Sequence, residues 1–369
     1  MSLRTFPASL RTPLGSSALW LLLGVVVALF LQWTQATALG GWSGLLAVGG
    51  DATVRPMIQA ELPDLVTVEG WGHDGQIGYA IALDLDGSEV SALLVDAGYR
   101  YRRILLPFAA SLGGLLDGPA LLGGFMLVTA LGMGAAAAAL ESIRRRFGWS
   151  PWIHLGVVAN PGLWMSVRLL TADVLAFGLA AVAVASYVAG RRQRVVVLLI
   201  LAVLAKDQYL LVALSLAGHA WFARRDRSGV AFMAIPGLVL AVWAACLQFA
   251  FGDGFTARGN LTWPGGWIPS SVEAWITVSA GDQVLVAVGV ASLAWATVAF
   301  FTSRSRLFRW LVGPWILLAA VSSEWVWALG NNVVRVFAPL LTLGVVASIA
   351  PLRQISVAGR RATASSRSG

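Results

Sequence analysis

Long apolar stretches, separated by short polar junctions, follow one another along most of the chain. Ten of them approach the length of a membrane helix, and they fall at 17–37, 119–141, 151–167, 171–189, 195–206, 209–223, 229–251, 282–302, 310–328 and 333–350. A helix needs about 20 apolar residues to cross the hydrocarbon core of a bilayer. The run at 195–206 is short, and we expect it to extend into the Lys206–Asp207 region. The pattern predicts an all-α integral membrane protein with about ten transmembrane helices.

Two polar segments interrupt this pattern. The segment 38–118 separates the first two apolar runs, and 353–369 follows the last one. We expect the first to be a large non-cytoplasmic loop with short helices at the membrane interface. The second is rich in Ser and Arg, which favours a disordered, basic cytoplasmic tail. The chain is therefore predicted to be a single polytopic membrane domain over 1–352, followed by this tail.

The arginines predict which side of the membrane each junction faces. If both termini are cytoplasmic, the segments on that side carry 18 arginines and two acidic residues, whereas the other side carries 8 basic and 16 acidic residues. Cytoplasmic junctions of membrane proteins are enriched in Lys and Arg. The alternation predicts a multi-pass protein of a bacterial inner or plasma membrane with both termini in the cytoplasm.

The composition agrees with this interpretation. The chain is 58% hydrophobic and 12% charged, with a mean hydropathy of +0.76, so it has too few charges to cover a soluble domain of this size. The net charge of +8 follows from the arginine-rich junctions and does not indicate a nucleic-acid partner. Neither a P-loop nor a dinucleotide-binding fingerprint is present. Any chemistry is therefore expected in the non-cytoplasmic loops and at the helix ends beneath them.

One candidate segment of the first loop runs from Trp71 to Asp84 and reads WGHDGQIGYAIALD. Gly72 and Gly75 stand close to Asp74, so the backbone can turn sharply and a substrate can approach. Beyond Gly75 the apolar spacing favours a helix with Asp74 at or near its N-terminus, where an ionised carboxylate is stabilised. For an isolated Asp-Gly pair, a plain helix cap would be the better explanation.

A second candidate segment, YRYRRILLP, runs from Tyr99 to Pro107. Arg100 and Arg103 are three residues apart and share one face of a helix. The arginines and aromatic residues fit a helix in the membrane interface, with its guanidinium groups directed at headgroup phosphates. A juxtamembrane anchor without a specific ligand explains the segment about as well.

Polar and ionisable residues also stand at the ends of later helices, on the same predicted side as Asp74. They form three groups: Arg168 with Asp173, Lys206 with Asp207, and Glu324 with Asn331, Asn332 and Arg335. Charged groups at membrane depth are unfavourable, so they usually face an interior and often mark function. The alternative is mutual neutralisation of the neighbours, Lys206 by Asp207 and Arg168 by Asp173.

The sequence contains no metal-binding motif. His73, His154 and His219 do not have the spacing of metal ligands, and no Ser-His-Asp or Cys-His order stands out. A divalent cation shared by Asp74 and Asp84 stays an open alternative, although their spacing does not require one. We therefore predict no metal-ligating residues and no definite cofactor.

Together, these segments resemble bacterial membrane glycosyltransferases of the GT-C type. GHDGQIGYAIALD followed by GYRYRRILLP resembles the family's first-loop signature, while LAKDQYLL and NNVVRVFAPLL resemble two later segments. The resemblance spans most of the chain, and the first-loop signature is its most specific part. The chain departs from the family pattern at His73, at Ile77 and Gly78, at Leu85 and at Asp207.

The resemblance implies roles for individual residues. Asp74 takes the position of the catalytic carboxylate. The lipid phosphate is expected to face a group of basic residues, to which we add Arg168 by its position: Arg100, Arg102, Arg103, Arg168, Lys206 and Arg335. Supporting roles are expected for the polar and aromatic residues around them: His73, Gln76, Tyr79, Asp84, Tyr99, Tyr101, Asp173, Asp207 and Asn331.

The resulting hypothesis is a glycosyltransferase that moves a hexosyl or pentosyl group from a polyprenyl-phosphate sugar to an envelope glycan, lipid or protein outside the cytoplasm. A carboxylate can serve as the base for an acceptor hydroxyl, and Arg and Lys can stabilise charge on a leaving phosphate. One alternative is a transporter or flippase of a lipid-linked or polar solute, although the two halves show no matching broken helices. The other is a non-catalytic membrane partner in envelope assembly.

Overall fold

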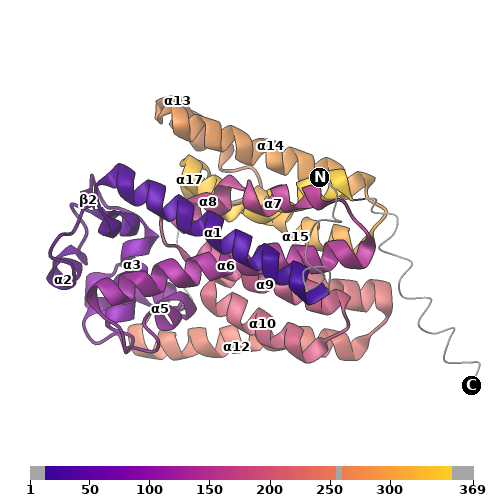
Figure 1. Cartoon of the computed structure of the whole chain (residues 1–369), viewed down its shortest axis with the longest axis horizontal. Coiled ribbons are helices and arrows are strands. Elements are labelled where there is room, and N and C mark those ends of the chain that lie inside the picture. The colour runs from indigo at the N-terminus through magenta and orange to yellow at the C-terminus, as the bar shows by residue number, and fades with distance from the viewer. Residues whose placement is uncertain (1–12, 255–259, 351–369) are drawn as a thin grey trace, which may run out of the picture.

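The computed structural model describes residues 13–254 and 260–350, and most of these residues are helical. The helices of the apolar runs lie alongside one another as a bundle, as Figure 1 shows. In chain order they are α1 (Pro13–Leu39), α6 (Gly118–Phe147), α8 (Pro161–Arg168), α9 (Ala172–Val188), α10 (Arg192–Ala205), α11 (Leu210–Gly218), α12 (Arg227–Phe251), α14 (Ala280–Thr302), α15 (Arg306–Val321) and α18 (Ala338–Ile349). Each of the ten apolar runs therefore contains at least one helix.

Within the described residues, four helices, α1, α6, α12 and α14, are each long and apolar enough to cross a membrane. A fifth span results if the bent pair α17 (Gly330–Val336) and α18 counts as one. Large apolar side chains such as Leu22, Phe30 and Phe301 are exposed on these helices, as expected where lipid covers a surface. The protein is thus an all-α, multi-pass membrane protein, and the number of ten spans stays a prediction.

Two of the expected spans are broken for identifiable reasons. In the 151–167 run, the side chain of Asn160 accepts hydrogen bonds from the backbone N–H groups of Gly162 and Leu163 at 2.9 and 3.3 Å. Asn160 therefore caps a new helix, α8, after η5 (Pro151–His154) and α7 (Leu155–Val158). In the last run, Pro339 lacks a backbone N–H, and α17 and α18 meet at 58°. This break leaves Arg335 in the last turn of α17.

The expectation that the 195–206 helix extends through the Lys206–Asp207 region is wrong. Helix α10 ends at Ala205, and Lys206 has an extended backbone with φ −157° and ψ 117°. A short 3-10 helix, η6 (Asp207–Tyr209), follows before α11 begins. Lys206 therefore stands at the end of a helix, and its side chain pairs with Asp173 of α9.

The first loop folds into short elements at one end of the bundle, on the left in Figure 1. They are η3 (Trp42–Leu46), α2 (Arg55–Glu61), α3 (Asp74–Leu83), η4 (Val90–Leu93), α4 (Ala97–Tyr101), α5 (Leu105–Ala110) and two short parallel strands, β1 (Val48–Gly49) and β2 (Thr67–Val68). They share a hydrophobic core that includes Leu45, Ile58 and Tyr79. The loop therefore contains the expected short helices, and their position at a membrane interface stays a prediction.

Two of the arginine-rich junctions are tied together by an ion pair, and α1 begins beside a third. Arg192, at the start of α10, pairs with Asp226, which precedes α12, at 2.6 Å. Ser16 of α1 donates a hydrogen bond to Glu141 near the end of α6, beside Arg144. In Figure 1 this N-terminal end of α1 lies opposite the first loop. The two ends of the bundle are thus chemically different, whereas the assignment of one to the cytoplasm stays a prediction, and the 353–369 tail lies outside the described residues.

The remaining elements are short helices at the two ends of the bundle. Helix α13 (Ile268–Thr277) precedes α14, and α16 (Glu324–Trp327) precedes α17. Trp275 of α13 donates a hydrogen bond to the carbonyl of Trp327 at 2.6 Å, which ties these two connections together. A π-helical turn, η7 (His219–Arg224), ends α11 on the arginine-rich side.

Candidate functional site

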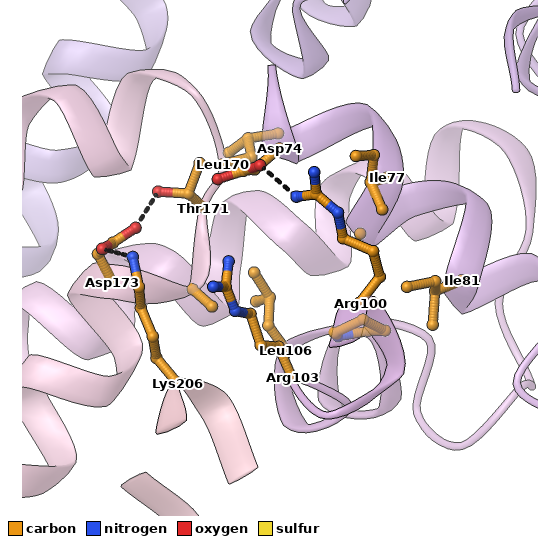
Figure 2. A pocket seen from close by; sticks show the side chains of 13 residues that line it. Asp74, Ile77, Ile81, Arg100, Arg103, Leu106, Leu170, Thr171, Asp173 and Lys206 are labelled. Atoms are coloured by element: carbon orange, nitrogen blue, oxygen red, sulfur yellow. Dashed lines mark hydrogen bonds and ion pairs between the residues drawn. The ribbon is translucent and has the colours of Figure 1, made fainter. Parts of the chain in front are cut away.

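A continuous network of charged side chains joins the first loop to the bundle. Asp74 of α3 pairs with Arg100 through Oδ1 and with Arg335 through Oδ2, both at 2.9 Å. Arg335 also lies 3.4 Å from Asp173 at the start of α9, and Asp173 pairs with Lys206. Figure 2 shows Asp74 and Arg100 facing Asp173 and Lys206 across the site. The network brings together five residues that the sequence places on four different helices and one helix end.

The network borders a pocket between the first loop and the turn before α9. Arg100, Arg103 and Lys206 supply positive charge to its wall, together with the carboxylates Asp74 and Asp173. The rest of the wall is apolar, apart from the hydroxyl of Thr171. It comes from α3, α5, the turn before α9 and the first residue of α9: Ile77, Gly78, Ile81, Leu106, Pro107, Leu170 and Ala172. The sequence did not single out this apolar wall, because its residues look like ordinary buried positions of short helices.

Asp74 is placed by the close packing of α3 against the turn between α8 and α9. It is the first residue of α3, and the residue before it, His73, is extended. A Cβ atom on Gly75 would lie 2.3 Å from the carbonyl oxygen of Leu169, so only glycine fits there. Gly72 has φ +71°, which also favours glycine. At Gly75 the missing side chain makes room for the protein's own backbone, whereas the sequence suggested room for a substrate.

Substituting Gly75 with Ala should destabilise the protein by about 1–3 kcal/mol, because the added methyl group overlaps backbone that cannot move aside easily. The measurement is the midpoint of thermal unfolding in detergent. Gly123→Ala is the matched control, since a Cβ there meets nothing within 4 Å. Equal midpoints for the two variants would contradict this account of how α3 is held.

Asp74 is ionised at neutral pH. Its side chain is 36% exposed and faces two guanidinium groups. Removal from water raises its pKa, but the charges of Arg335 and Arg100 outweigh this effect and hold the pKa well below its usual value of 3.8. Each carboxylate oxygen has a second lone pair, so Asp74 can still accept a hydrogen bond from a bound hydroxyl.

The ring of Tyr99 lies beside three arginines of the first loop. The guanidinium carbons of Arg100, Arg102 and Arg103 lie 5.6, 4.7 and 4.5 Å from the centre of its ring. Arg103 also donates a hydrogen bond to the Tyr99 hydroxyl, which accepts another from Asn260 at 3.0 Å. Across residues 13–254 and 260–350, Arg103 forms no ion pair with a carboxylate. Its guanidinium group therefore lines the pocket without a direct carboxylate partner among the described residues.

The neutralising pairs suggested by sequence proximity are not the pairs that form. Lys206 pairs with Asp173 rather than with its neighbour, and Asp207 instead lies 3.4 Å from Arg102. Arg168 is near the site but does not line the pocket, and its Nε has no hydrogen-bond partner among the described residues. Each acidic residue of this region thus faces a base from a distant part of the chain.

Asp84 lies outside the pocket, at the opposite end of α3 and about 15 Å from Asp74 by helical rise. Its carboxylate accepts hydrogen bonds from the backbone N–H groups of Ser88, Glu89 and Val90. Burial alone would raise the pKa of Asp84, but these hydrogen bonds have the larger effect and lower it, so the group is ionised at neutral pH. Because both carboxylates are occupied and far apart, they do not fit a shared metal ion, and the described residues contain no cluster of three metal-ligand side chains.

Several other expected site residues make contacts within the first loop. Tyr79 donates a hydrogen bond to the carbonyl of Gly118 at 2.8 Å, and Tyr101 donates one to the carbonyl of Asp84 at 2.7 Å. Gln76 bonds to the backbone of Gly49 and Trp71. Asn331 lies on α17, and its Oδ1 is buried without a partner in the described chain. These contacts shape the loop around the pocket, and a direct role toward a ligand stays a prediction.

Comparisons of the chain with protein-family models, with curated proteins and with solved structures find no match. We therefore infer the function from the chemistry of the pocket.

Proposed function

We propose that the protein is a GT-C-type membrane glycosyltransferase that moves a sugar from a polyprenyl-phosphate carrier to an acceptor hydroxyl. The observation that carries this proposal is the excess of positive charge at the pocket, on the end of an apolar bundle. Five bases face three carboxylates: Arg100, Arg102, Arg103, Lys206 and Arg335 against Asp74, Asp173 and Asp207. A lipid-linked phosphate combines the anionic and apolar character that such a site would bind.

The proposed reaction is a single displacement. The acceptor oxygen bonds to the anomeric carbon while the bond from that carbon to the phosphate oxygen breaks. The electron pair of the broken bond stays on the lipid phosphate, where Arg103, Arg100 and Lys206 stabilise the charge. The proton of the acceptor hydroxyl passes to Asp74. The products are the glycosylated acceptor with an inverted anomeric centre and the free lipid phosphate.

A carboxylate with a low pKa is adequate as this base. The hydroxyl becomes strongly acidic only as its oxygen bonds to the anomeric carbon, so the proton can move late in the reaction. Before that point Asp74 orients the hydroxyl by accepting its hydrogen bond, and the two arginines hold the carboxylate in place. Positioning is thus the main contribution that we assign to Asp74.

The direct test is to supply the purified protein in lipid vesicles with a panel of labelled polyprenyl-phosphate sugars and envelope acceptors. Release of polyprenyl phosphate together with labelled acceptor would support the transferase. Movement of the intact sugar lipid across the bilayer, without release of phosphate, would replace it with the flippase alternative. If neither event occurs with any donor, the remaining explanation is a non-catalytic membrane partner in envelope assembly.

The proposal also predicts the pH dependence of transfer. Because the pKa of Asp74 lies below 3.8, the carboxylate stays ionised as pH falls, and its protonation should cause no loss of kcat between about pH 8 and pH 5. His73 has a pKa lowered by burial and by Arg335, so its charge also appears only below pH 6.5. The measurement is kcat against pH at constant ionic strength. A decline with an apparent pKa near 6–7 would assign the base to another group.

A further inference from the structure

A second cavity lies inside the bundle, away from the charged pocket. Its walls come from α6, α7, α9, η6, α11, α15 and α18. Almost all of the lining is aliphatic or aromatic, including Leu140, Phe177 and Trp315. We call it the central slot.

The central slot follows the axis of the bundle for about 10 Å. On α6 it is lined by Ala136, Leu140 and Ile143, which are four and three residues apart and so share one helical face. On α9 it is lined from Phe177 to Val184, again seven residues, and seven residues of helix rise about 10 Å. This shape fits a linear chain aligned with the membrane normal.

One end of the central slot is closed. Tyr209 forms it, with 1% of its surface exposed, its hydroxyl bonded to the carbonyl of Asp173 and its ring packed edge-on against Trp315 at 5.4 Å. The slot thus stops beneath the charged network of the first loop. The slot is separate from the charged pocket, and its lining is apolar.

The other end of the central slot faces the arginine-rich side. Its residues there, Ile143, Val184 and Leu311, are partly exposed, whereas Ala136 and Tyr209 are buried. Arg146 is exposed and lies one turn beyond Ile143 on the same face of α6. An anionic group at this opening would meet complementary charge.

We propose that the central slot binds a hydrocarbon chain of an anionic phospholipid, whose headgroup lies at the arginine-rich end of the bundle. A cavity with an almost entirely apolar lining offers few polar partners for water. The surrounding bilayer supplies linear hydrocarbon, and apolar contact inside the slot replaces contacts among lipid tails. The headgroup adds charge-assisted contacts with exposed arginines such as Arg146. This site does not depend on the glycosyltransferase proposal, because it lies in another part of the molecule.

The test uses phosphatidylglycerol with a photoreactive diazirine in the middle of one acyl chain, incorporated with the full-length protein into vesicles. After illumination, labelled peptides are mapped by mass spectrometry. We expect labels at Leu140, Phe177 or Trp315, and we expect them to be lost in Ala180→Phe, which fills the slot. Ala291→Phe, at an exposed position of α14, is the matched control and should keep them.

The remaining outcomes separate the parts of the proposal. Labels confined to outward-facing residues such as Leu238, with the same pattern in both variants, would overturn the site. Equal slot labelling by the corresponding phosphatidylcholine would overturn the assignment of an anionic headgroup. Arg146→Gln provides a second variant that leaves the slot unfilled, and it should weaken labelling by phosphatidylglycerol while leaving that by phosphatidylcholine unchanged.

Discussion

Replacing Asp74 with Asn should lower kcat for sugar transfer by about 10²–10⁴-fold, the contribution typical of a positioned base. The amide has nearly the same volume as the carboxylate but accepts the proton of the acceptor hydroxyl far less readily. It also removes the charge that Arg100 and Arg335 hold in place. The measurement is release of polyprenyl phosphate and labelled product by wild type and variant at equal amounts of folded protein.

Asp51→Asn is the matched control for this experiment. It makes the same change of charge on the same loop, at an exposed position outside the pocket. It should retain the rate of the wild type. Comparable activity in Asp74→Asn and Asp51→Asn would remove Asp74 from the mechanism.

The second large effect is expected at Asp173, where Asp173→Asn should destabilise the fold by about 3–5 kcal/mol. Only 1% of Asp173 is exposed, and it faces both Lys206 and Arg335. Without the carboxylate, Lys206 is left buried and loses its ion-pair partner, and this is the costly state. Unfolding in detergent, followed by heat or by denaturant, measures the loss.

A double variant distinguishes lost charge balance from lost packing. Asp173→Asn combined with Lys206→Met removes the stranded cation along with its partner, so the combined loss should be smaller than the sum of the two single losses. Additive losses would indicate that the two side chains act independently. The hydroxyl of Thr171 donates a hydrogen bond to Asp173 at 3.0 Å, so a substitution at Thr171 serves as a neighbouring reference for these unfolding measurements.

The broad architecture follows from features that are local in sequence. Apolar runs mark helices, and the alternation of arginines predicts which junctions belong together, as the Arg192–Asp226 pair illustrates. The location of Asp74 at the start of a helix was also predictable from the glycines around it and the apolar spacing that follows. The predicted topology places Asp74, Arg100 and Arg335 on the same side of the membrane, which suggested a common site. The structure brings these three residues together.

Features that depend on distant partners were not predictable from the sequence. Lys206 has an acidic neighbour in sequence, yet it pairs with Asp173, 33 positions away, because α10 stops one residue earlier. Asp84 looked like a site residue, but backbone N–H groups of the following turn occupy its carboxylate. In both cases the three-dimensional neighbours decide what a charged group does.

Because the two ends of the bundle differ in charge, the voltage across the membrane acts on the orientation of the protein. Moving one positive charge through a potential of 100 mV changes the free energy by about 2.3 kcal/mol. The segments predicted on one side, termini included, carry 18 arginines, so an inverted molecule would have to hold many charges against the field. We therefore expect a potential that is negative on the arginine-rich side to stabilise the predicted orientation, in which the Asp74 pocket faces the positive compartment.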